Sequence, residues 1–176
     1  MGLSLLATAW TFFCVSGSVF NPNVAIALTY QQLESWIIKL ILLLFQKSQV
    51  LGGIVASALL NAALPGKLAV DCTLGPGVTP AQAIIVEGFL TTALTLTVLL
   101  VDVEKHWSTP FAPCAIGLVL FATHFFGVVF TGAALNSARA FGPALVINSS
   151  SDTLVYSIYW VGPSVGALVA TALYHL

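Results

Sequence analysis

The chain alternates long apolar runs with short polar interruptions, and the lengths of the runs are the first guide to its fold. Five runs are long enough, or nearly so, to cross a bilayer as helices: residues 1–17, 36–64, 81–101, 111–130 and 154–173. A span needs about 20 apolar residues, so the first run is slightly short. Because the runs are continuous rather than alternating, they favour helices over a membrane barrel. The pattern predicts an all-α polytopic membrane protein with five spanning helices.

Two further apolar segments, 21–30 and 136–147, are only about half as long as a span. Each begins with an asparagine, which is a strong helix N-cap. The stretches that lead into them align as an internal repeat, SGSVFNP from Ser16 and TGAALNS from Thr131. Repeated halves with short, interrupted hydrophobic segments point to a binding or conduction site where the repeats meet. We therefore expect two re-entrant half-helices that meet inside the membrane.

Composition supports a bilayer as the solvent of this chain. Of its 176 residues 59% are hydrophobic and only 6% are charged, whereas a soluble domain carries roughly 25% charged residues. Helices satisfy their backbone polar groups internally, as a lipid environment requires. We expect a single domain over residues 1–176, located as an integral, multi-pass protein in the plasma membrane or an internal membrane.

Several classes of function find no support in the sequence. The net charge is −1, and no basic cluster follows the chain, so a nucleic acid partner is not expected. The three cysteines and three histidines lack ligand spacing, so neither a metal nor another cofactor is expected. No paired carboxylates or Ser-His-Asp arrangement points to an enzyme. Cys72 is expected to be a free thiol on an exposed loop.

The repeated segments resemble the two Asn-Pro-Ala boxes of the major intrinsic proteins, the aquaporins. The matching positions are Asn21-Pro22-Asn23, Asn136-Ser137-Ala138 with Arg139 after it, segment 49–53, Glu87 and segment 159–163. The pattern is similar to that of orthodox water channels and also of fungal members. The resemblance implies six spans around two half-helices. This chain is therefore expected to begin in the family's second span and to lack its first helix, as a fragment or as a five-span protein.

The resemblance also implies roles for individual residues. Asn21 and Asn136 would cap the half-helices and turn side-chain N–H groups toward the pore. Residues His124, Ala133 and Arg139 would form most of an outer constriction, with a histidine where water-selective members have one. Glu87 would support the site from behind. Positive half-helix ends and a pore arginine both raise the barrier for cations and protons.

The function expected from this resemblance is a passive, selective water channel, with water as permeant, a lipid bilayer around it and a homotetrameric assembly. Two alternatives stay open: a channel for another small neutral solute such as hydrogen peroxide or glycerol, and a non-conducting truncated membrane protein. Two departures from the boxes bear on this choice. Asn23 stands where alanine is expected and Ser137 where proline is expected. The larger, polar Asn23 is expected to narrow the pore or to add a binding partner.

Overall fold

The computed structural model describes residues 1–31, 36–66, 68–104, 107–147 and 153–176, which form helices joined by loops and turns. The elements follow the order α1 (Gly2–Ser16), α2 (Pro22–Gln31), α3 (Trp36–Ala63), α4 (Pro80–Val98), η1 (Leu99–Val103), η2 (Thr109–Phe111), α5 (Ala112–Thr131), α6 (Ser137–Val146) and α7 (Thr153–Tyr174). η1 is a π-helical turn that continues α4, and η2 is a 3-10 turn that leads into α5.

Three helical segments in the described part of the chain are long and apolar enough to cross a membrane: Pro80–Val103, Thr109–Thr131 and Ser157–Tyr174. The first has 24 residues, which extend about 36 Å at 1.5 Å per residue and so exceed the roughly 30 Å of bilayer hydrocarbon. α1 is a shorter apolar helix of 15 residues, and α3 has 28 residues. Together with α1 and α3, these segments occupy the places of the five predicted spans.

The two helices that precede the repeated segments end in the same way. Gly17 closes α1 with φ 68°, and Gly132 closes α5 with φ 72°. Their N–H groups donate to the carbonyls of Phe13 and Val128, four residues back. Glycine adopts this left-handed conformation without a Cβ clash, which makes it the usual residue after a helix C-terminus. The sequence repeat is therefore also a repeat of backbone geometry.

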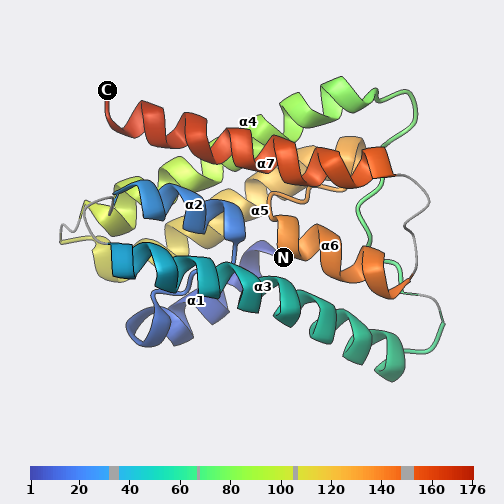
Figure 1. Cartoon of the computed structure of the whole chain (residues 1–176), viewed down its shortest axis with the longest axis horizontal. Coiled ribbons are helices and arrows are strands. Elements are labelled where there is room, and N and C mark those ends of the chain that lie inside the picture. The colour runs from blue at the N-terminus through green and yellow to red at the C-terminus, as the bar shows by residue number, and fades with distance from the viewer. Residues whose placement is uncertain (32–35, 67, 105–106, 148–152) are drawn as a thin grey trace.

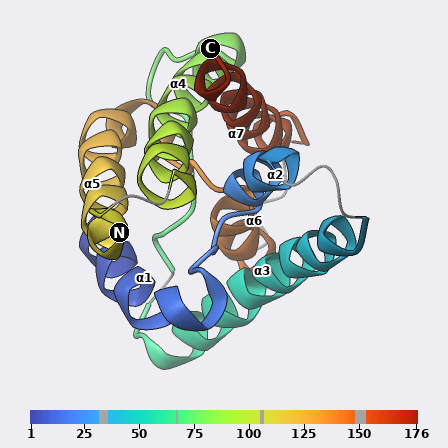
Figure 2. The same cartoon turned by 90° about the vertical axis from the view of Figure 1, so that its left-hand side faces the viewer.

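The two short helices lie between the long ones, with their N-terminal ends pointing at each other near the middle of the molecule (Figure 1). Seen along the bundle, α1, α5, α4 and α7 follow one another around a ring that α3, α2 and α6 complete (Figure 2). Both α2 and α6 contact α3 and α7. α3 belongs to the first repeat and packs against α6 from the second, whereas α7 belongs to the second repeat and packs against α2 from the first. Each half of the chain therefore holds the short helix of the other half.

Glycines allow the long helices to pack closely. A Cβ built at Gly162 on α7 would lie 2.8 Å from the Cβ of Glu87 on α4, and one at Gly166 would lie 2.9 Å from the Cβ of Thr91. The contacts of α1 with α5 and of α3 with α6 use glycines in the same way, at Gly2, Gly117, Gly53 and Gly142. Small residues at these crossings let backbones approach, which is how helices associate in a membrane.

Replacing Gly162 by alanine is expected to destabilise the bundle, because its methyl group would overlap Glu87 and the carbonyl oxygen of Ile84, 3.0 Å from the built Cβ. Overpacking of this kind costs about 1–3 kcal/mol. We expect a thermal unfolding midpoint in detergent several degrees below that of the unchanged protein. The control is Gly52→Ala on α3, where a Cβ meets no atom within 4 Å. Equal midpoints for the two variants would contradict this packing.

Candidate functional site

Two strained loops carry the chain into the short helices. Ser18 lies in the first loop with φ 55°, and Ala133 and Leu135 lie in the second with φ 49° and 51°. Left-handed geometry at a non-glycine residue costs of order 1–3 kcal/mol and persists only where surrounding contacts enforce it. Side chains and carbonyls of the long helices supply such contacts, and each loop ends at an asparagine.

Asn21 and Asn136 are joined by reciprocal hydrogen bonds between the two halves of the chain. The Nδ2 of Asn21 donates to the carbonyl of Leu135 at 2.7 Å, and the Nδ2 of Asn136 donates to the carbonyl of Phe20 at 2.9 Å. Each asparagine thus binds the residue that directly precedes the other. An amide nitrogen has two protons, so one proton on each Nδ2 is used in this bond rather than turned toward a pore.

The side-chain oxygens of the same asparagines face their own helices. Asn136 Oδ1 accepts from the N–H groups of Ala138 and Arg139 at 2.9 and 3.2 Å. Asn21 Oδ1 accepts from the N–H of Asn23 at 2.9 Å. These are N-cap contacts, which satisfy otherwise unpaired donors at a helix start. The oxygen therefore belongs to the helix and the nitrogen to the opposite half of the chain.

Glu87 fixes the second loop from within α4. Its Oε1 accepts from the Thr131 hydroxyl at 2.6 Å and from the N–H of Ala134 at 2.9 Å, and its Oε2 accepts from the N–H of Leu135 at 2.8 Å. The residue is fully buried. Both oxygens only accept, which suits a carboxylate. Glu87 thereby holds the loop whose last carbonyl receives the Asn21 amide.

The first loop is held differently. Gln49 on α3 donates its Nε2 to the carbonyl of Val19, and the Ser18 hydroxyl donates to the carbonyl of Ala9 at 2.7 Å. Within the described residues no carboxylate contacts the N–H groups of this loop. The two halves thus share a backbone shape but use different side chains to maintain it.

His124 presents an unused acceptor to the interior. Its Nδ1 lies 3.1 Å from the carbonyl oxygen of Leu120, one turn back on α5. A carbonyl oxygen only accepts, so Nδ1 carries the proton and Nε2 is the acceptor. Nε2 is buried and has no partner among the residues that the structure describes.

Arg139 is positioned by the loop between α3 and α4. Its Nη1 donates to the carbonyl of Val70 at 2.9 Å and to the sulfur of Cys72 at 2.7 Å, while its buried Nε has no partner in the described part of the chain. Cys72 is buried, so the expectation of an exposed thiol was wrong. Burial raises the pKa of the Cys72 thiol to about 12, against a smaller opposing effect of Arg139. The neutral sulfur is then an acceptor for the guanidinium. No motif or spacing in the sequence indicates this contact.

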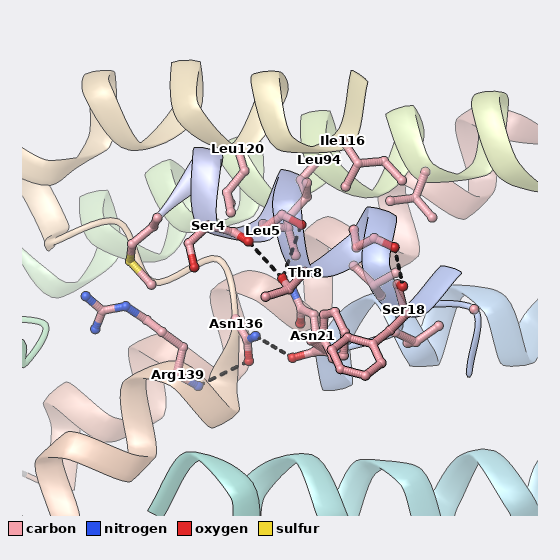
Figure 3. Close-up of a pocket in the computed structure, with 18 of the residues that line it drawn as sticks. Ser4, Leu5, Thr8, Ser18, Asn21, Leu94, Ile116, Leu120, Asn136 and Arg139 are labelled. Atoms are coloured by element: carbon pink, nitrogen blue, oxygen red, sulfur yellow. Dashed lines mark hydrogen bonds between the residues drawn. The ribbon is translucent and has the colours of Figure 1, made fainter. Parts of the chain in front are cut away.

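A cavity of about 480 Å³ connects these side chains. Its lining along α5 is Ile116, Leu120 and His124, which are four residues apart and so extend about 12 Å along the helix. Figure 3 shows Arg139, Asn136 and Asn21 toward one side of this cavity and Leu120, Ile116 and Leu94 toward the other. Helix α1 contributes a further wall, made of Met1, Ser4, Leu5, Thr8, Ala9, Phe12 and Phe13.

Other predicted site residues lie away from this cavity. Ala133 is fully buried in an apolar cluster with Val24 and Leu90, so the structure does not bring it to His124 and Arg139. Its left-handed backbone accompanies this inward placement, and the next residue, Ala134, lines the cavity instead.

Four residues of the two boxes are also buried rather than cavity-lining: Pro22, Asn23, Ser137 and Ala138. Asn23, which was expected to narrow the pore or to add a binding partner, therefore does not border the cavity. Its polar atoms bond to protein groups instead.

The fold and site define a helical membrane protein with a cavity beside two short helices, and comparison with known proteins assigns its family. The family model described as "Major intrinsic protein" matches residues 1–174, and the chain belongs to this family, whose members are channels rather than enzymes. The resemblance predicted from the two boxes is thereby confirmed, as are the all-helical fold and the membrane location.

Individual relatives are fungal aquaporins. An aquaporin of Laccaria bicolor is 45% identical over 174 residues, which are 99% of this chain and 54% of that protein. Aquaporin-5 of Botryotinia fuckeliana is 43% identical over 175 residues, or 99% of this chain and 44% of that protein. The chain therefore spans about half the length of these relatives. Among solved structures, an aquaglyceroporin from Plasmodium falciparum matches with a TM-score of 0.79 at 23% identity, covering 98% of this chain and 78% of that one. That likeness shows the shared fold.

Glu87→Gln is expected to loosen the second loop. An amide has one acceptor oxygen, so an NH₂ group would face one of the three donors that the carboxylate now satisfies. Hydrogen bonds to charged groups contribute about 1.5–3 kcal/mol each, and about 2–4 °C per kcal/mol is usual for a chain of this size. We expect a thermal unfolding midpoint lower by roughly 3–10 °C. Glu104→Gln, at an exposed carboxylate whose hydrogen bond from Tyr174 an amide oxygen can still accept, is the control and should change little. Equal midpoints for the unchanged protein and Glu87→Gln would argue against this role of the carboxylate.

Proposed function

We propose that this protein is a passive, selective water channel of a membrane. The observation that carries the proposal is the single cavity into which Asn21, Asn136, His124 and Arg139 all reach. Its remaining lining is largely apolar, formed by side chains such as Leu120 and Ile116. A narrow apolar path with a few fixed polar groups suits a small polar solute, because each group replaces part of the hydration that the solute gives up.

The two asparagines supply the fixed polar groups of this path. The second N–H of each asparagine amide, which is not used in the bond between the halves, is a donor to a water oxygen. A water at the two asparagines accepts two hydrogen bonds and can donate none to them, so a continuous proton-conducting chain of waters is interrupted there.

Positive charge at the asparagines and at Arg139 opposes cations, while the cavity lining also includes the carboxylate of Asp102. The N-terminal ends of α2 and α6 meet near the asparagines (Figure 1), and each helix start carries roughly half a positive charge. The guanidinium of Arg139 adds a full positive charge to the lining of the same cavity. Both features would repel a cation or a hydronium ion, whereas a neutral water molecule would not be repelled by them.

The proposal extends to the assembly and its surroundings. Family membership supports a homotetramer in a lipid bilayer, with one pore in each protomer. Large apolar side chains are exposed on several helices, among them Phe121, Phe125 and Phe126 on α5, and such surfaces are suited to lipid or to a neighbouring protomer. Native mass spectrometry from detergent tests this point, and a monomer as the sole species would argue against the tetramer.

The function is tested with proteoliposomes that hold the purified chain. After an osmotic step, light scattering should report shrinkage much faster than that of empty liposomes, with a low activation energy. A glycerol gradient should give a rate close to that of empty liposomes. Shrinkage no faster than in empty liposomes, from protein shown to be folded, would contradict the proposal, and fast glycerol entry would favour a polyol channel instead.

His124→Ala is expected to reduce selectivity rather than abolish conduction. The change removes the imidazole ring from the lining of the cavity that Arg139 also lines, so larger solutes gain room. Glycerol permeability should rise several-fold, while water permeability stays well above that of empty liposomes. His175→Ala, at an exposed position near the C-terminus, is the matched control and should leave both rates unchanged. Glycerol permeability that is unaltered in His124→Ala would remove this residue from the selectivity mechanism.

A further inference from the structure

The two departures from the Asn-Pro-Ala boxes contact each other directly. Asn23 Oδ1 accepts from the backbone N–H of Ser137 at 3.0 Å and lies 2.9 Å from the Ser137 hydroxyl oxygen. The residues are 114 positions apart and begin opposite half-helices. The pair therefore forms a second polar connection between the halves, behind the one made by Asn21 and Asn136.

The remaining polar atoms of this pair bond to α7. Asn23 Nδ2 donates to the Ser164 hydroxyl at 3.1 Å. The Ser137 hydroxyl is also 3.0 Å from the carbonyl of Tyr159. Because Pro163 lies inside α7 and has no N–H, the Tyr159 carbonyl four residues earlier lacks its helical donor. Since the Ser137 N–H already serves Asn23, its hydroxyl proton is available for this carbonyl.

Burial makes these bonds interdependent. Asn23 is 1% exposed and Ser137 is 0% exposed. A buried donor or acceptor that loses its partner lowers stability, whereas removing both partners together can be nearly neutral. Proline at 137 would have no N–H to offer Asn23, and alanine at 23 would leave the N–H of Ser137 without an acceptor. Each residue is thus suited to the other and ill suited to the residue that the boxes usually have.

The pair is also adjacent to the groups that face the cavity. Ser137 directly follows Asn136, and the N–H of Asn23 donates to the Oδ1 of Asn21 at 2.9 Å. A shift of either half-helix start would therefore move a cavity asparagine with it.

We propose that Asn23 and Ser137 are a coupled pair of positioning residues, which seat the two half-helices against each other and against α7 and so set the placement of Asn21 and Asn136. The permeability part of this inference rests on the proposed water channel, and the stability part does not. Asn23 acts through its neighbours, since it does not line the cavity.

A double-mutant cycle tests the coupling. The variants are Asn23→Ala, Ser137→Pro and the double variant, which together recreate Asn-Pro-Ala in both boxes. Position 137 is the first residue of α6, where proline is well tolerated. Each single change is expected to lower the thermal unfolding midpoint in detergent by roughly 3–10 °C. The double variant should lose clearly less than the sum of the two single losses.

Water permeability is the second measurement, because a purely structural role of the pair would leave it unchanged in folded variants. At a temperature where all variants are folded, each single variant should conduct water several-fold more slowly per channel, and the double variant should recover most of the rate. Asn61→Ala, at an exposed asparagine on α3, is the control and should leave midpoint and rate unchanged. Ser137→Ala keeps the N–H for Asn23 but loses the bond to Tyr159, so its loss should be smaller than that of Ser137→Pro.

The outcomes separate the two proposals. Additive midpoints with full conduction in every variant would overturn the coupled pair and leave the water channel standing. Non-additive midpoints in a protein that conducts no water would support the pair and overturn the channel proposal. Single variants that fail to fold beside a folded double variant would support the coupling most strongly, and a double variant that unfolds as fully as the singles would overturn it.

Discussion

The arrangement of the whole molecule depends on one reciprocal interaction, in which Asn21 and Asn136 each donate a side-chain N–H to the carbonyl that precedes the other. Asn21 binds the Leu135 carbonyl, and Asn136 binds the Phe20 carbonyl. This exchange ties two half-helices from opposite ends of the chain at mid-molecule, where helical hydrogen bonds cannot reach. It also fixes the orientation of both amides, because the oxygens cap their own helices. One N–H per amide is left outside this bond.

The loops that present these asparagines are costly, and the surrounding structure compensates for them unequally. In the second loop two left-handed residues, Ala133 and Leu135, are offset by the buried carboxylate of Glu87. The first loop is held through a carbonyl, because the Nε2 of Gln49 donates to the carbonyl oxygen of Val19. Behind both loops, Asn23 and Ser137 close a polar network with α7. The site is therefore symmetric in backbone and asymmetric in the side chains that hold it.

Much of this could be predicted from the sequence, because membrane helices and their breaks are encoded locally. Run lengths predict the spans, and the repeat predicts two short helices that meet. Contacts between distant residues were not accessible in this way. Nothing near Cys72 indicates that its sulfur receives Arg139. The inward placement of Ala133 depends on a backbone angle that its residue type does not specify. Asn23 and Ser137 look like two independent defects in sequence, and only their proximity shows that they compensate for each other.

The most direct test of this account is the exchange of the side-chain amide protons of Asn21 and Asn136 with water. Water-edited solid-state NMR of the ¹⁵N-labelled protein in lipid measures it for each Nδ2 proton separately. The account predicts one proton of each amide that receives magnetisation from water rapidly and one that is protected by the carbonyl of Leu135 or Phe20. Two equally protected or two equally water-contacting protons on either asparagine would contradict it.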